Sequence, residues 1–309
     1  METLHPITLE EIILFTLELL IVHYLIGDLF STVTPYICDL TKKLDSRMDI
    51  IGRVSWRIFI SLNLIVISAF FILSILPVMR LLYFFYFGCA IILFVWKKIN
   101  ELKKLTGIKY EIAHFFRESP ILHITTLIKL IVISSFFITV SHVVINNTIY
   151  GSLLGDASTH TLLIYYMINS QTIIMDLEPL YNCYILYPLG SHVIACLSVI
   201  ILRVPLYKIV ILQQMFTLLI SFLAIDFLAQ ILFGKVKSMK RFLNLILLCI
   251  FGFSYYPYNA LGWGGLPFQT GFTLMIFDLP ILYLLILESR EEIKNKLEKT
   301  LFISVIIAN

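Results

Sequence analysis

Long runs of apolar residues constrain the fold of this chain more than any other feature of its sequence. Residues 56–76 and 79–96 form two such runs that meet at Pro77, and residues 206–233 form a third. An α-helix needs about 20 apolar residues to cross a bilayer, and these runs reach or approach that length. With 59% hydrophobic and 14% charged residues, the chain also carries much less charge than a soluble domain, which is about a quarter charged. We therefore predict an all-α protein, a polytopic transmembrane helical bundle with several crossings of the cell (plasma) membrane.

The basic residues predict which side of the membrane each loop faces. Lys and Arg gather in residues 97–117 and 235–241, whereas none occurs from Leu130 to Leu202. Because basic loops stay in the cytoplasm, the two basic stretches are predicted to lie inside and the long segment 146–205 outside. The formal net charge is only +3 and the basic residues lie at the ends of apolar runs, so nothing indicates nucleic acid as a partner.

The apolar runs 192–202 and 206–233 pose a problem of parity. If both crossed the membrane, the basic residues 235–241 would lie outside. The first run is short, and Arg203-Val204-Pro205 interrupts it. We therefore favour a re-entrant or interfacial helix over 192–202, followed by one inward crossing over 206–233, with two full crossings as the alternative.

The N-terminal segment 9–27 combines apolar residues with Glu10, Glu11, Glu18 and His23. Carboxylates inside a membrane span are costly and often functional, whereas a helix at the membrane surface keeps them in water. We favour the surface helix, and the sequence leaves the orientation of this segment open.

Two parts are predicted along the chain. Residues 1–120 form an N-terminal membrane segment with the helical hairpin and a cytoplasmic basic loop. Residues 121–309 form a transmembrane core whose extended outer loop, 146–205, carries interfacial helices. The apolar run 301–309 is too short to span, so either the last helix is partial or the chain is a fragment of a longer protein.

The outer loop contains the residues with the clearest chemical potential. Asp156 and His160 stand four positions apart, so on a helix they share a face. A carboxylate at this place can act as a general base on a hydroxyl group or can bind a divalent cation. The simpler alternative is that Asp156 only caps the following helix. Asp176 and Glu178 form a second acidic pair that can share a metal ion or form a solvated turn before Pro179.

Two further elements have the composition of binding loops. In YPLGSH, Pro188 and Gly190 shape a turn, and His192 can face a phosphate group or cap the helix that follows. In YNALGWGGLPF, three glycines next to Trp263 permit close approach of a ligand, or simply form a turn at the membrane interface.

The order of these elements resembles the GT-C superfamily of membrane glycosyltransferases. The resemblance consists of a span, an outer loop that begins with GDASTH, a YPLGSH element that leads into a helix, and a basic turn. The later WGGLP loop is similar to one in related archaeal and bacterial polytopic membrane proteins. The similarity covers roughly residues 127–287, but the chain has no WWDYG-like motif, and Thr161-Leu162 replaces the Arg that oligosaccharyltransferases place soon after the loop aspartate.

The resemblance implies a GT-C-like core and transfer of a sugar from a polyprenyl- or dolichyl-phosphate donor at the extracytoplasmic face. The donor lipid and the bilayer would then be the partners, and a divalent cation (Mg or Mn) the cofactor. The rival hypothesis is a non-enzymatic transporter or an assembly scaffold for surface polysaccharide. The predicted site comprises catalytic Asp156 and His160, substrate-binding Tyr187, His192, Arg203 and Trp263, and metal-binding Asp156, Asp176 and Glu178.

Overall fold

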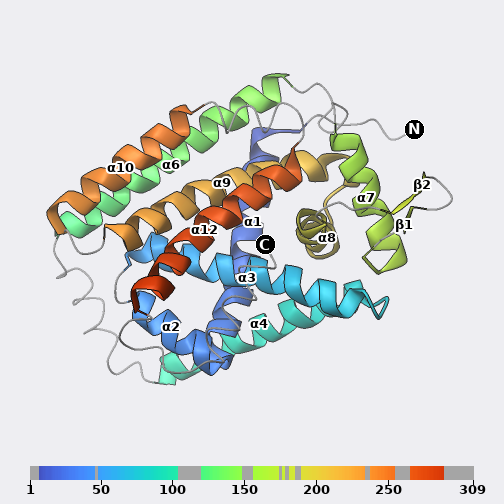
Figure 1. Ribbon diagram of the computed structural model, residues 1–309, viewed down its shortest axis with the longest axis horizontal. Helices are drawn as coiled ribbons and strands as arrows, with labels where there is room; N and C mark the ends of the chain where they lie inside the picture. Colours follow the sequence, from blue (N-terminus) through green and yellow to red (C-terminus); the bar gives the residue numbers. More distant parts are fainter. Residues whose placement is uncertain are drawn as a thin grey trace.

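The computed structural model is a bundle of α-helices with one short β-hairpin (Figure 1). It describes residues 7–45, 48–103, 120–147, 156–173, 176–177, 181–184, 189–233, 237–254 and 265–288. The described residues form ten helices: α1 (Leu9–Val33), α2 (Pro35–Asp45), α3 (Ile50–Leu73), α4 (Met79–Lys103), α6 (Pro120–Asn147), α7 (Ala157–Ser170), α8 (Gly190–Leu202), α9 (Leu206–Leu232), α10 (Lys237–Phe253) and α12 (Leu266–Glu288). Strand β1 (Asp176–Leu177) pairs antiparallel with β2 (Tyr181–Tyr184). The predicted all-α bundle is confirmed.

Four helices are long and apolar enough to cross a membrane, namely α1, α3, α4 and α9. Shorter apolar helical segments occupy 126–142 in α6, 190–202 in α8 and 243–253 in α10. These helices confirm the prediction of a multi-pass membrane protein. On α4, large apolar side chains such as Phe85, Ile92 and Trp96 are exposed, as expected of a surface that faces lipid.

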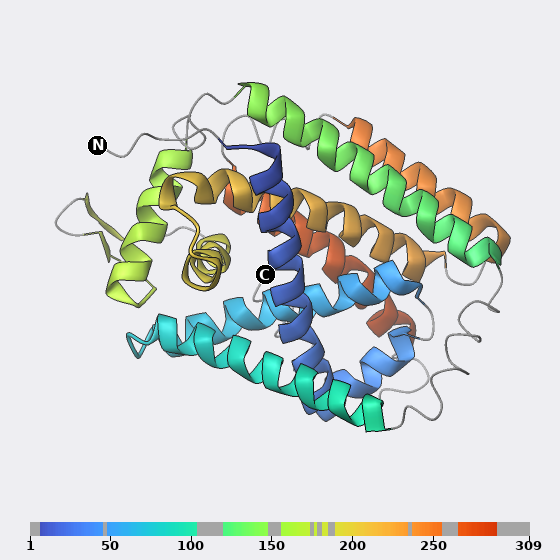
Figure 2. The same ribbon diagram turned by 180° about the vertical axis from the view of Figure 1, so that it is seen from behind.

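Helix α1 differs from the predicted surface helix, because it is one of the four long apolar helices and lies across the bundle (Figure 2). It crosses α3 closely, and a Cβ atom on Gly27 would lie 1.8 Å from the carbonyl oxygen of Arg57. Two of its carboxylates are tolerated although α1 is not a surface helix. Glu18 is exposed, whereas Glu11 forms a capping box with Thr8 and a 2.5 Å ion pair with Lys208.

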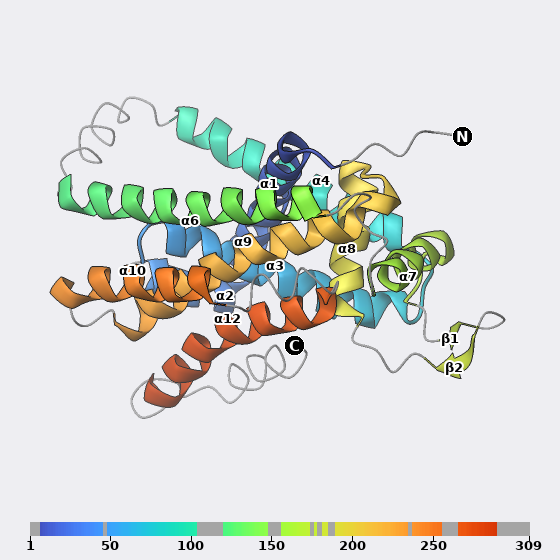
Figure 3. The same cartoon turned by 90° about the horizontal axis from the view of Figure 1, so that it is seen from above.

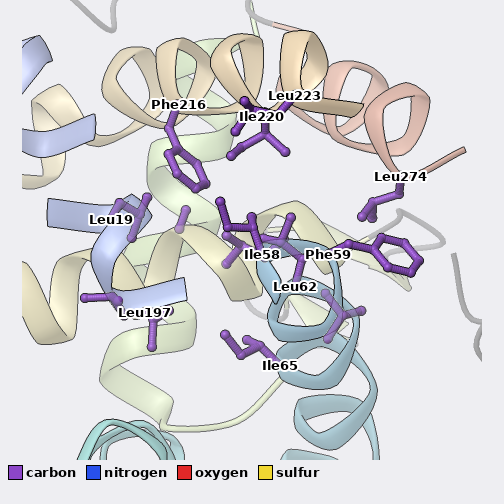
Figure 4. Close-up of a cluster of buried hydrophobic side chains, with 14 of the residues drawn as sticks. Leu19, Ile58, Phe59, Leu62, Ile65, Leu197, Phe216, Ile220, Leu223 and Leu274 are labelled. Carbon is purple, nitrogen blue, oxygen red and sulfur yellow. The ribbon is translucent and has the colours of Figure 1, made fainter. Parts of the chain in front are cut away.

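The core is formed where α1, α3, α8, α9 and α12 meet, and helix α9 is buried along most of its length. Figure 4 shows part of this core, with Leu19 of α1, Phe59 of α3, Leu197 of α8, Phe216 of α9 and Leu274 of α12. In a bilayer the lipid tails are as apolar as these side chains, so close packing and interhelical hydrogen bonds hold the helices together.

Helices α7 and α8 and the β-hairpin lie at one end of the bundle, here named the α7–α8 end (Figure 3). Gln171, in the left-handed region with φ 61°, attaches α7 to α4 by accepting hydrogen bonds from the backbone N–H groups of Met79 and Arg80. The opposite end, where α2 precedes α3 and α9 finishes, is named the α2 end (Figure 1).

Helix α8 has 13 residues and a length of about 20 Å, which is short of the roughly 30 Å hydrocarbon core. Residues 191–198 are all buried, with α7, α9 and α3 among the helices around them. This burial favours the re-entrant alternative over a helix on the membrane surface. Helix α9 then makes the single run from the α7–α8 end to the α2 end.

Candidate functional site

Asp156 stands immediately before the first turn of α7, at its N-cap position. Its backbone carbonyl accepts the N–H of His160 at 3.0 Å, but its carboxylate makes no capping hydrogen bond. The residue has φ −73° and ψ −9°, whereas a side chain reaches the first amides of a helix from an extended backbone. The predicted capping role is therefore wrong for the side chain. The carboxylate is exposed at the α7–α8 end.

His160 and His192 come together in the interior of this end. The Nδ1 atom of His160 lies 3.0 Å from Nε2 of His192, and the two side chains are 2% and 0% exposed. The GDASTH and YPLGSH elements, whose histidines are 32 residues apart, thus meet through α7 and α8. Asp156 is exposed while His160 is buried, so these two side chains do not share one environment as their spacing predicts.

The histidine pair is connected to a hydroxyl group, because Nδ1 of His192 lies 3.3 Å from Oγ of Ser191. In one arrangement His160 Nδ1–H donates to His192, and His192 Nδ1–H donates to Ser191. In the other, the Ser191 hydroxyl donates to His192, and His192 Nε2–H donates to His160. Exchange between the two arrangements keeps both imidazoles neutral only if one proton enters at His160 Nε2 and another leaves the Ser191 hydroxyl. A proton relay through the pair therefore needs a proton donor at one end and an acceptor at the other.

Arg203 ends α8 in the left-handed region, with φ 56°, and its side chain is exposed. This backbone conformation costs a non-glycine residue on the order of 1 kcal/mol. Lys208, on the first turn of α9, is buried against Glu11 and is engaged there. Arg203 is consequently the better placed of the two cations to contact an anionic group from outside.

The other predicted site residues are not placed. Tyr187, Glu178 and Trp263 lie outside the described residues, and Asp176 begins β1 without a described side-chain environment. Within the described part of the chain, no group of three or more His, Cys, Asp or Glu side chains could hold a metal ion. The Asp156–Asp176–Glu178 metal site therefore stays a prediction. The two histidine nitrogens alone do not suit Mg²⁺, which prefers oxygen ligands.

The structure contains a buried cluster of charges at the α2 end that was not predicted from the sequence. Lys129 Nζ of α6 lies 2.8 Å from Oδ2 of Asp49, the N-cap residue of α3, and 2.7 Å from Oδ1 of Asp226 of α9. Gln230 Nε2 contacts the remaining oxygen of each carboxylate. We call these four residues the Asp49–Lys129–Asp226 ring. The signal in the sequence is a lone charged residue inside an apolar run, as in TTLIKLIVI and FLAIDFLAQ.

The ring also sets the ionisation of Asp49, which lies just before the span of α3. Burial alone would raise the pKa of Asp49. The opposing effect is larger, because the Lys129 ammonium and hydrogen bonds from Gly52 N–H and Gln230 hold this pKa below its usual value. Asp49 is therefore a carboxylate at neutral pH.

These features define a class, a multi-pass α-helical membrane protein with a buried histidine pair at one end and a buried charge ring near the other. Comparison with known proteins adds no closer relationship, since no family model, curated protein or solved structure matches the chain at a significant level.

Proposed function

We propose that the protein is a membrane glycosyltransferase that takes a sugar from a polyprenyl- or dolichyl-phosphate donor at the extracytoplasmic face. The observation that supports this most is the contact between His160 and His192 beside the exposed Asp156. It joins the two sequence elements on which the resemblance to GT-C glycosyltransferases rests. The α7–α8 end would face outward, at the surface of the plasma membrane.

In the proposed reaction an acceptor hydroxyl attacks the anomeric carbon of the sugar. The bond between that carbon and the phosphate oxygen breaks, and polyprenyl phosphate leaves. Asp156 takes the proton of the hydroxyl as general base. The exposed carboxylate then gives this proton up to water, while the hydrogen bond between His160 and His192 holds α7 and α8 together beneath it. The Arg203 guanidinium binds the phosphate, whose negative charge grows as the bond breaks. A divalent cation (Mg or Mn) at Asp156 remains part of the proposal.

A second candidate function is a transporter or scaffold of surface-polysaccharide assembly, which would use the α7–α8 end for binding without chemistry. The Asp49–Lys129–Asp226 ring favours it, because ionisable residues within membrane spans often mark paths for ions or protons.

Sugar transfer by the purified protein in liposomes tests the proposal. With a polyprenyl-phosphate sugar as donor, we expect Asp156→Asn to lower the rate by about 100-fold or more, the effect of losing a general base. Glu18→Gln makes the same chemical change at an exposed carboxylate of α1 and should leave the rate unchanged. Equal rates for Asp156→Asn and wild type would contradict the catalytic role. Donor binding without transfer in the wild type would favour the second candidate.

A further inference from the structure

The Asp49–Lys129–Asp226 ring is a closed cycle of hydrogen bonds. Lys129 connects one oxygen of each carboxylate, and Gln230 Nε2 connects the other two. Gln230 Oε1 accepts the backbone N–H of Asp49 at 2.9 Å, which fixes the orientation of its carboxamide. With both carboxylates and the ammonium ionised, the ring has one net negative charge inside the bundle.

The charged side chains described on neighbouring helices do not cancel this charge. On α12, the nearly buried ionisable side chain is Asp278, which is 8% exposed and, being a carboxylate, cannot supply positive charge to the ring. On α10 the described side chain that contacts the ring is neutral Asn244. The remaining described charges near this end are exposed or paired with each other: Arg53, Lys42 and Lys98 are exposed, Arg57 pairs with Asp45, and Lys97 pairs with Asp28.

A proton is the cation that this geometry admits. Each carboxylate oxygen of the ring already lies within hydrogen-bonding distance of a nitrogen donor. A metal ion needs about six oxygen ligands and would have to displace Lys129. A proton needs no such space, and it makes the ring neutral.

The O–H of a protonated carboxyl group needs a hydrogen-bond acceptor, and the two aspartates differ in whether a neighbouring group can provide one. Asp49 contacts only donors that cannot become acceptors. They are the Gly52 backbone N–H, the Lys129 ammonium and the fixed amide of Gln230. Asp226 faces Asn244, whose Nδ2 lies 3.2 Å from its Oδ1. Asn244 is 1% exposed, and its own Oδ1 has no hydrogen-bond partner. The Asn244 carboxamide can therefore turn over without breaking another hydrogen bond, and it then presents an oxygen to Asp226.

We infer that the ring is a proton-binding site, that the proton resides on Asp226, and that Asn244 recognises the protonated form. On binding, the Asp226 Oδ1–H donates to the turned Asn244, Gln230 still donates to Asp226 Oδ2, and Lys129 stays with Asp49. On release, Asn244 returns to donating. Asp49, whose side chain is 14% exposed, connects the site to the α2 end of the bundle. This site is separate from the glycosyl transfer proposed for the other end.

Infrared spectroscopy of the protein in lipid nanodiscs tests the inference, because a protonated carboxyl group has a carbonyl band apart from those of carboxylates and amides. At neutral pH the wild type should show such a band, with a shift in D₂O. Asp226→Asn should remove it, whereas Asp278→Asn, a control at another nearly buried carboxylate, should leave that component in place. A wild type without the band, or a band that survives Asp226→Asn, would overturn the inference.

Two further variants test the reason for protonation and do not remove Asp226. In Asp49→Asn the charges of Lys129 and Asp226 balance, so the band should disappear at neutral pH. In Asn244→Leu the acceptor is lost, so the band should disappear at a lower pH than in the wild type. Circular dichroism and size-exclusion profiles identify folded variants. Retention of the band in a folded Asp49→Asn protein would overturn the charge-balance argument.

Discussion

At the scale of single residues, Lys129 places a charged ammonium group inside the bundle. Its side chain is 4% exposed and lies between two carboxylates. Removing one partner of a buried ion pair leaves uncompensated charge and costs about 3–5 kcal/mol. We expect Lys129→Met to destabilise the protein by about this amount in unfolding titrations in detergent. Lys98→Met removes an exposed lysine and serves as the control, with an expected change below about 0.5 kcal/mol. Equal stability of the two variants would show that the ring contributes little.

Arg203 gives a second prediction at this scale, in which stability and activity change in opposite directions. Glycine adopts a left-handed backbone without steric cost, so Arg203→Gly should stabilise the protein by roughly 1 kcal/mol. The same change removes the guanidinium proposed to bind the donor phosphate, so sugar transfer should fall by about 10-fold or more, the effect of losing a charged hydrogen bond. Arg80→Gln, at the other exposed arginine of this end, is the control for a general effect of charge. Transfer at the wild-type rate in Arg203→Gly would exclude the phosphate contact.

At the scale of elements, α1 and α3 cross at close range at Gly27. A methyl group on Gly27 would lie 1.8 Å from the carbonyl oxygen of Arg57, so α1 must move away in Gly27→Ala. Overpacking of this kind costs about 1–3 kcal/mol, which we expect as a loss of unfolding free energy. Gly88→Ala on α4 is the matched control, because nothing lies within 4 Å of its added methyl group. The control should be neutral or slightly stabilising, since alanine favours helix. A harmless Gly27→Ala would contradict the close crossing.

The elements also show what the sequence can and cannot predict. The spans of α3, α4 and α9 follow from local composition, because about 20 apolar residues suffice for a crossing wherever the chain leads. For α1 the same reasoning fails, since whether Glu11 is tolerated depends on Lys208, which is 197 residues away. The ring also depends on residues that are far apart in the sequence, because the hydrogen bond from Asp49 to Gln230 joins residues 181 apart. In the candidate site, GDASTH and YPLGSH were separately recognisable, but the contact of their histidines depends on how α7 packs on α8.

At the scale of the whole molecule, the charges give the bundle a direction across the membrane. The α7–α8 end has Arg80, Arg203 and Lys208 as its described basic side chains. The α2 end, where α9 finishes, is followed in the sequence by the basic residues 235–241, and it includes the paired Arg57 and Lys97. The positive-inside rule therefore predicts that the α2 end is cytoplasmic, with one crossing by α9 and none by α8. In this orientation α9 begins at the outer side and ends at the cytoplasmic side, and the proposed transfer site would face outward.

Cysteine labelling of intact cells tests this orientation. In a variant without native cysteines, a cysteine at Ser238, in the first turn of α10, should react with an impermeant maleimide only after the membrane is opened. A cysteine at Ser158, exposed on α7, should react from outside without such treatment. Because α8 and α9 lie between these positions, an extra crossing by α8 would place both cysteines on the same side. Labelling of Ser238→Cys from outside would therefore refute the single crossing and, with Ser158→Cys also labelled, would assign full crossings to both helices.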